Sequence, residues 1–466
     1  MSTEDSDRAD QQFTARTRRE LLKVMGLTGA GLMLGGPLLA ACGSSASKSA
    51  ATAAPGGTPG GTATGGGSSS GAGAKLIDIL KIDKSVAGGG KTWQMGAVLA
   101  LTGPGSYYGK TMTNGINLAV KHIKAAGGPD IQVTTLDHKS GDAQAGVDAM
   151  RQLVAKKVPA KLASYVDDLG AMLPATEQAK MFTLDGGGGT SIFGQGKPYF
   201  YGTRAITPND ALPGALKYLK KAMPGKTKLG YIVWDLGEPV NGEIKADLLA
   251  KATAQGFEFN GLYEVYPVGA SDYSTLIPKI KANLPDILIA YGSGQDPGHF
   301  SSQWYTSGGT LCPFIGFELT PDGVNAAKGA YDKYGFTFAA DYFDENVGVN
   351  PLAKLFISEF QAEYKLFPDF YAANFYENTL AMWDMIRRVL KKGGDINSGE
   401  QLDAAFQADL SAASVYGGDA TTVGQYKIDP KTHSVIRRPM GIFEQKDGKV
   451  KALAYYDING DDYRLA

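Results

Sequence analysis

The sequence predicts an α/β protein with two lobes, each built on a parallel sheet that helices flank. Three observations lead to this prediction. The chain has 466 residues, which is more than one compact core usually holds. Hydrophobic residues make up 43% and charged residues 20%, as in soluble globular proteins. Short apolar runs alternate with stretches of helical periodicity in two successive blocks.

The first block begins at Trp93, where apolar runs are followed by segments with one apolar face. We expect its strands at residues 94–101, 131–137, 161–166 and 181–185. We expect its helices at residues 111–126, 142–156 and 174–180.

The second block begins after Pro208 and repeats the alternation. We expect helices at residues 212–222, 242–255 and 273–284, and strands at residues 229–234, 262–265, 287–291 and 314–317. Residues 351–392 are predicted to be largely helical. Residues 424–460 are predicted to form short antiparallel strands with a turn at Asp447-Gly448. Ligands of such sheets bind beyond the carboxyl ends of the strands, so we expect a cleft between two facing lobes.

The N-terminus has the pattern of an export signal. Arg18-Arg19 precedes an apolar stretch, residues 21–41, that ends in Leu-Ala-Ala before Cys42. This order is typical of a bacterial lipoprotein signal peptide at residues 1–41, and the arginine pair indicates twin-arginine export. Cys42 is then the lipidated first residue of the mature chain. A transmembrane anchor is the alternative, which the glycines and Pro37 disfavour.

Residues 42–75 are rich in Gly, Ser, Thr and Ala and have almost no large apolar side chain. Such a segment buries too little surface to offset the entropy of ordering it. We therefore expect a flexible tether that holds the protein outside the cytoplasm, at the cell membrane.

The composition and the motifs disfavour both an enzyme and a nucleic-acid-binding protein. The net charge is −1, so no basic surface is expected for nucleic acid. The four histidines lie at no metal-ligand spacing, and no cofactor motif is complete. The Gly-x-Ser-x-Gly at residues 67–71 falls in the expected tether, where it cannot form a nucleophile elbow. We expect no cofactor, no metal and no catalytic residue, and Cys312 is interpreted as a buried small hydrophobe.

Four segments resemble a known family, the fourth of them, residues 371–380, more weakly than the others. Residues 95–109 read MGAVLALTGPGSYYG, residues 272–291 read DYSTLIPKIKANLPDILIAY, and residues 314–318 read FIGFE. In this order they resemble leucine/isoleucine/valine-binding proteins, which are receptors of ATP-binding-cassette (ABC) importers. The likeness runs over residues 92–460.

The resemblance implies a type I periplasmic-binding fold whose chain crosses between the lobes three times. One lobe is then residues 92–205 plus 341–430, and the other is residues 206–340 plus 431–466. The resemblance also implies a monomer that closes around its ligand at the hinge and then docks on the membrane permease.

The resemblance assigns ligand contacts to three residues. Tyr108 and Tyr371 fall where the family places aromatic rings, and Glu318 falls where a carboxylate pairs with the ligand ammonium. The tyrosines are alternatively core aromatics, and Glu318 is alternatively a surface carboxylate. Because Glu318 ends an apolar strand, burial there would require a cationic partner.

The family's carboxylate-binding hydroxyls are missing, which leaves the ligand class open. Asp168 stands in the first such region, and the second reads Asp185-Gly-Gly187-Gly-Gly189. Backbone N–H groups at Gly187 and Gly189 are candidate anion donors, whereas the aspartates repel a carboxylate. Aromatic residues at predicted strand ends favour an aromatic, amide-like or cationic ligand. These residues are Tyr107, Tyr108, Tyr165, Trp234, Tyr291 and Phe317, of which Trp234 is an additional candidate contact.

The predicted function is therefore an extracytoplasmic receptor that captures an amino acid or a related small polar or aromatic compound for an ABC permease. Two alternatives remain at this point. One is a ligand sensor on the same fold that signals to a membrane kinase or receptor. The other is an extracellular enzyme that uses the cleft.

Overall fold

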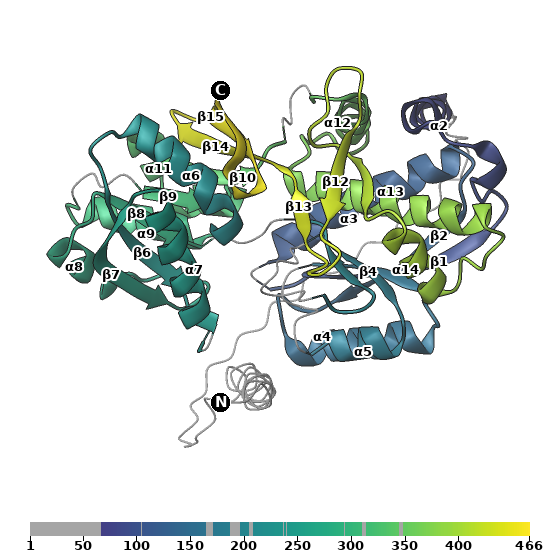
Figure 1. The fold of residues 1–466 in the computed structure, drawn as a ribbon, viewed down its shortest axis with the longest axis horizontal. Coiled ribbons are helices and arrows are strands. Elements are labelled where there is room, and N and C mark those ends of the chain that lie inside the picture. The colour runs from purple at the N-terminus through teal and green to yellow at the C-terminus, as the bar shows by residue number, and fades with distance from the viewer. Residues whose placement is uncertain are drawn as a thin grey trace, which may run out of the picture.

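The computed structural model describes residues 67–466 except 104, 165–170, 187–195, 205–207, 236, 239, 293, 310–313 and 344–347. The predictions for Cys42, Cys312, Asp168, Gly187 and Gly189 fall outside the described residues. Figure 1 shows two lobes, one coloured from blue to light green and the other mainly teal, with yellow strands near their junction.

The first lobe is built on a five-stranded parallel sheet in the order β2-β1-β3-β4-β5. Its strands are β1 (Thr92–Leu99), β2 (Asp130–Asp137), β3 (Ala160–Ala163), β4 (Phe182–Asp185) and β5 (Phe200–Gly202). Helices α3 (Ser106–Ala125), α4 (Ala143–Ala155) and α5 (Leu173–Gln178) alternate with these strands. We call this unit the five-stranded lobe.

The second lobe is built on an eight-stranded mixed sheet in the order β16-β15-β14-β10-β9-β8-β6-β7. Its parallel strands are β6 (Lys228–Trp234), β7 (Glu258–Tyr266), β8 (Ile287–Tyr291), β9 (Phe314–Phe317) and β10 (Phe336–Asp341). Three antiparallel strands extend it: β14 (Pro439–Lys446), β15 (Lys449–Asp457) and β16 (Asp461–Leu465). Its helices are α6 (Pro208–Ala222), α7 (Val240–Ala254), α8 (Leu276–Ala282), α9 (Asp296–Thr306), α10 (Pro321–Ala326) and α11 (Ala330–Tyr334). We call this unit the eight-stranded lobe.

The chain returns to the five-stranded lobe after β10. It forms helices α12 (Pro351–Tyr364), α13 (Phe370–Lys391) and α14 (Gly399–Gln407), then a small antiparallel sheet. The strands of this sheet are β11 (Ser411–Ser414), β12 (Gly424–Ile428) and β13 (Val435–Arg437). The chain thus passes between the lobes after β5, after β10 and after β13.

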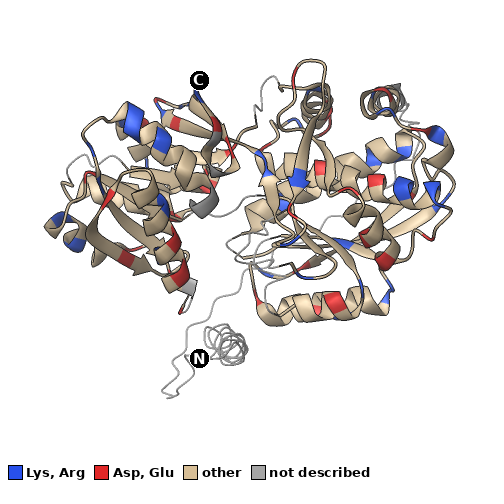
Figure 2. Cartoon of the chain, viewed as in Figure 1, with Lys and Arg blue, Asp and Glu red and all other residues tan. Residues whose placement is uncertain are grey.

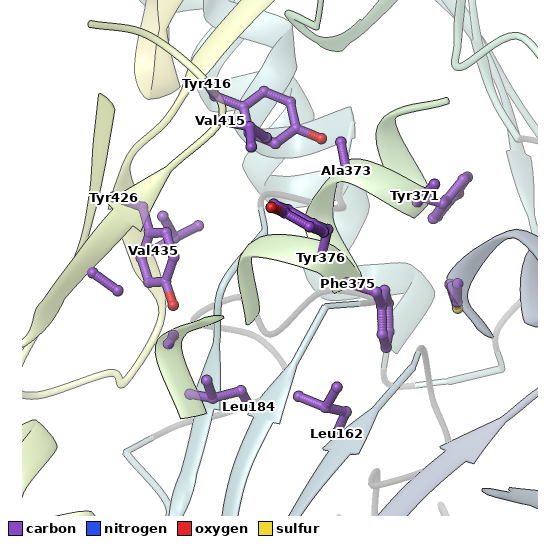
Figure 3. Packing of buried hydrophobic residues seen from close by; sticks show 14 of the residues in the cluster. Leu162, Leu184, Tyr371, Ala373, Phe375, Tyr376, Val415, Tyr416, Tyr426 and Val435 are labelled. Atoms are coloured by element: carbon purple, nitrogen blue, oxygen red, sulfur yellow. The ribbon is translucent and has the colours of Figure 1, made fainter. Parts of the chain in front are cut away.

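Helix α13 forms the centre of the five-stranded lobe. Its residues are buried on nearly every side, because α3 covers one face and the small sheet covers another. Gly115 of α3 permits this approach, since a Cβ there would lie 2.2 Å from the carbonyl oxygen of Ala372. Figure 3 shows Phe375 and Tyr376 of α13 above Leu162 and Leu184 of the parallel sheet, with Tyr426 and Val435 of the small sheet to one side.

The expected tether extends too far at its C-terminal end. Helix α2 (Gly67–Leu80) begins inside it, and Ala72 and Leu76 are buried. The helix packs on α3 and α12, so tertiary burial orders a segment whose composition alone disfavours order. The tether prediction is therefore wrong for residues 67–75.

Charged residues of both signs are interspersed over both lobes, in keeping with the net charge of −1 (Figure 2). Among the described residues, no helix is both long and apolar enough to cross a membrane.

Candidate functional site

The candidate site lies where the three connecting segments run side by side between the lobes. Gly202 and Ser434 form a parallel bridge, and the Tyr342 N–H donates to the Pro439 carbonyl at 3.0 Å. Each segment carries one buried charged residue: Arg204 after β5, Asp341 at the end of β10, and Arg438 between β13 and β14. We call these segments the hinge.

Arg204 occupies the centre of the hinge and is 2% exposed. Its Nη2 donates to Oε1 of Glu318 at 2.5 Å, and its Nε donates to Oδ2 of Asp341. The guanidinium also lies over the rings of Phe370 and Tyr371, 4.7 and 4.6 Å from their centroids. A planar fork with fixed donors suits this double pairing and stacking better than an ammonium group.

Glu318 follows strand β9 and connects the two lobes. Its Oε2 accepts a hydrogen bond from the Tyr371 hydroxyl at 2.7 Å, and Tyr371 belongs to α13 of the five-stranded lobe. Its backbone is left-handed, with φ of 67°, although its N–H still donates to Ala339 at 2.9 Å. A non-glycine residue in this region costs energy, and such conformations cluster at functional sites.

A second arginine continues the ion pairs into the five-stranded lobe. Arg438 Nη1 donates to Glu377 of α13 at 2.8 Å and to the Thr203 carbonyl at 3.2 Å, and its Nε lies 3.4 Å from Asp341. Glu377 also accepts the Ser414 hydroxyl at 2.6 Å. The result is an unbroken series Glu318–Arg204–Asp341–Arg438–Glu377, which we call the hinge ion chain.

Burial and pairing set the charges of the hinge ion chain. Burial disfavours the charged form of Arg204, yet Asp341 and Glu318 raise its pKa well above the usual value. Burial raises the pKa of Glu377, against the opposing effect of Arg438. The hinge ion chain thus joins three carboxyl groups to two guanidiniums.

Aromatic residues of both lobes lie near Glu318, of which Tyr371 contacts it directly. The rings of Tyr108 and Tyr371 meet edge to face with centroids 4.7 Å apart. The Tyr107 hydroxyl donates at 2.5 Å to Asp369, the partly buried N-cap of α13, which fixes the start of that helix. On the other side, Phe317 precedes Glu318 in the chain, and its ring centroid lies 6.5 Å from that of Tyr291.

The structure therefore brings together three of the sequence-predicted site residues, Tyr108, Glu318 and Tyr371. Trp234 lies within the eight-stranded lobe, where its Nε1 donates to Asp296 at 2.6 Å. Its ring centroid lies 6.4 Å from that of Tyr291.

Sequence reasoning missed Arg204, Asp341 and Arg438. The requirement that a buried Glu318 have a cationic partner was the available signal, but it did not identify Arg204, which lies 114 positions away in the chain. Arg438 directly precedes the apolar strand β14, and no local pattern distinguishes it from its exposed neighbour Arg437.

Two cavities lie elsewhere, between α2 and the small sheet, with volumes of about 170 and 340 Å³. The charged residues at the smaller cavity are engaged with protein groups. Arg388, for example, donates to the carbonyls of Asp409 and Ser411. In the described part of the chain, no cluster of His, Cys, Asp and Glu could hold a metal ion.

Two α/β lobes joined by three adjacent connections, with a carboxylate and aromatic rings at their junction, define a two-lobed solute-binding protein of the type I periplasmic-binding fold. A profile described as periplasmic binding protein matches residues 92–449. The chain therefore belongs to the periplasmic binding protein family, which implies an extracytoplasmic, solute-binding role.

Solved structures share the fold at low sequence identity. A solute-binding protein of an ABC transporter from R. palustris, in complex with benzoate, is 20% identical with a TM-score of 0.65, covering 80% of this chain and 98% of its own. A leucine-binding protein from Thermotoga maritima is 18% identical with a TM-score of 0.65, covering 78% and 98%. A branched-chain amino acid binding protein from Streptococcus pneumoniae, in complex with isoleucine, is 20% identical with a TM-score of 0.63, covering 79% and 99%. A comparison of the sequence with curated proteins found no match.

Proposed function

We propose that this protein is a receptor that captures an amino acid or a related small polar or aromatic compound between its lobes and delivers it to an ABC permease. The proposal rests on the environment of Glu318. This residue is a nearly buried carboxylate in a left-handed conformation at a strand end, touched by residues of both lobes. Because the hinge ion chain has three carboxyl groups and only two guanidiniums, a cationic ligand group at Glu318 would supply a third cation.

The aromatic residues near Glu318 favour a ligand with an apolar or aromatic body. Tyr108 and Tyr371 are buried beside Glu318 and Phe317 precedes it in the chain, and aromatic rings of this kind pack against such a group. The structural relatives bind isoleucine in one case and benzoate in another. Binding of both amino acids and aromatic acids should therefore be measured.

The remaining parts of the proposal concern delivery. Residues 1–41 act as a twin-arginine lipoprotein signal peptide, and lipid on Cys42 anchors the monomeric receptor to the outer face of the cell membrane. The lobes close on the ligand, and the closed form docks on the permease. The receptor carries out no chemistry on its ligand and holds no cofactor.

Isothermal titration calorimetry tests the ligand site. The titrants are leucine, phenylalanine, benzoate, urea, short amides and polyamines. We expect binding of at least one amine-bearing compound, and Glu318→Gln should weaken it about tenfold or more, because a hydrogen bond to a charged group is lost. Glu363→Gln is the matched control, since Glu363 pairs with Lys121 on the surface. Equal affinities of the two variants would remove Glu318 from the site.

A further inference from the structure

We propose that Arg204 is a positioning residue that couples the binding of a cationic ligand group at Glu318 to the movement of the hinge. This inference rests on the proposed function and names the residue that makes the site selective for an ammonium group. It follows from three features of Arg204: the lobes that it connects, the way it is held, and the lone pairs that it leaves on Glu318.

Arg204 joins parts of the molecule that hinge motion displaces. It follows β5 of the five-stranded lobe, whereas both of its carboxylate partners, Glu318 and Asp341, end strands of the eight-stranded lobe. A rotation of one lobe against the other must therefore change the distance from Arg204 to Glu318, to Asp341 or to both. The position of the Glu318 carboxylate and the angle of the hinge are thus linked through one guanidinium.

The guanidinium has little freedom to adjust alone. It is held by Asp341 at Nε, by Glu318 at Nη2 and by two aromatic rings of α13, Phe370 and Tyr371. Asp341 is itself close to Arg438, which is bonded to α13 through Glu377. The carboxylate of Glu318 is therefore fixed from the hinge side before any ligand is bound, which lowers the cost of ordering it.

Glu318 keeps acceptor capacity in this arrangement. A carboxylate offers about four lone-pair positions, and Arg204 and Tyr371 use one on each oxygen. An ammonium group can thus bind to the remaining positions. Arg204 and Tyr371 set the direction from which it must approach, so the correct placement of the ligand depends on Arg204 without any contact between the two.

The test compares ligands that differ only in the ammonium group. The pairs are leucine with 4-methylpentanoate and phenylalanine with 3-phenylpropanoate. Titration calorimetry gives the ratio of their dissociation constants, and small-angle scattering gives the decrease in radius of gyration on binding. The variant is Arg204→Lys, which keeps the charge but loses the planar fork. The control is Arg437→Lys, since Arg437 lies in the hinge but is 61% exposed.

We expect the wild type and Arg437→Lys to prefer the amino acids and to contract on binding them. Arg204→Lys should lose about tenfold or more of this preference and most of the contraction, because the Glu318 carboxylate is no longer fixed. If Arg204→Lys does not fold, Asp341→Asn replaces it, since this change removes the anchor of Arg204 with almost no change in side-chain volume.

The outcomes separate this inference from the proposed function. A lower melting temperature with an unchanged preference for the amino acids would make Arg204 purely structural and overturn the inference, while the receptor function stands. Binding of none of the four probes by the wild type would overturn the inference, while the receptor function would then be decided by the remaining titrants of the calorimetric test.

Discussion

Replacing Arg438 by methionine should destabilise the protein strongly, because it leaves the buried Glu377 carboxyl without its cationic partner and leaves Asp341 with Arg204 alone. Arg438 is fully buried, lies 2.8 Å from Glu377 and 3.4 Å from Asp341, and its guanidinium covers the ring of Tyr416. Removal of one member of a buried ion pair typically costs about 3–5 kcal/mol, mostly from the charge left behind. Arg437→Met is the control. Its ion pair with Asp457 is exposed, so its loss should cost less than about 1 kcal/mol.

Thermal unfolding followed by circular dichroism measures this difference. Unfolding entropy is about 2.1 cal/mol/K per residue, so a folded body of roughly 390 residues loses about 1.2 °C in Tm per kcal/mol. Arg438→Met should therefore melt about 4–6 °C below the wild type, and Arg437→Met within about 1 °C of it. Equal melting temperatures for the two variants would refute the idea that the hinge ion chain is a tightly coupled buried unit.

The pH dependence of the Arg438→Met defect provides a second check. Burial already raises the pKa of Glu377, and Arg438 is the main influence that opposes this rise. Loss of Arg438 thus raises the pKa of Glu377 further above its value in the unfolded chain. A carboxyl group with a raised folded-state pKa binds more protons in the folded state, so acidification favours folding at this site. The difference in Tm from the wild type should therefore be smaller at pH 5 than at pH 8. A difference that grows on acidification would contradict this account.

Three further changes test other parts of the structure. Tyr371→Phe removes the 2.7 Å hydrogen bond to Glu318 and should weaken amine-bearing ligands about tenfold in titration calorimetry, with a change in Tm of no more than a few degrees. Cys42→Ser should move the protein from the membrane fraction to the soluble fraction after cell lysis, as followed by immunoblotting, while ligand affinity stays unchanged. Gly115→Ala should cost about 1–3 kcal/mol in urea unfolding because its Cβ would collide with α13, whereas Gly71→Ala, with open space at its Cβ, should cost nothing measurable.

Sequence patterns located the strands best where burial is complete. Strands 287–291 and 314–317 were predicted with the bounds that the structure shows, because each is an apolar run between turn-forming residues. The N-terminal part of α3 was missed. Its apolar periodicity begins near residue 111, while the helix begins at Ser106 and places Tyr108 beside α13. Strands β10 and β11 were also missed, since their pairing rather than their composition defines them.

The candidate site could be predicted only in part. A resemblance placed Tyr108, Glu318 and Tyr371 near a ligand, and the apolar strand before Glu318 indicated that a cation must neutralise it. The identity of that cation depends on the three connections, which bring Arg204 within reach of carboxylates 114 and 137 positions further along the chain. No periodicity or composition encodes such a contact, because it follows from the topology of the whole chain.

The hinge ion chain is better explained by a role in positioning than by stability. Buried ion pairs are often no more stabilising than apolar residues of similar volume, because desolvation offsets the attraction between the charges. Apolar side chains would, however, let the three connections slide past one another, whereas Arg204 and Arg438 bind their partners only in defined directions. Hydrogen bonds join Arg438 to α13 and Arg204 to Asp341 and Glu318, and a 3.4 Å ion pair joins Arg438 to Asp341. A ligand that changes the partners of Glu318 therefore acts on the same bonds that set the angle between the lobes.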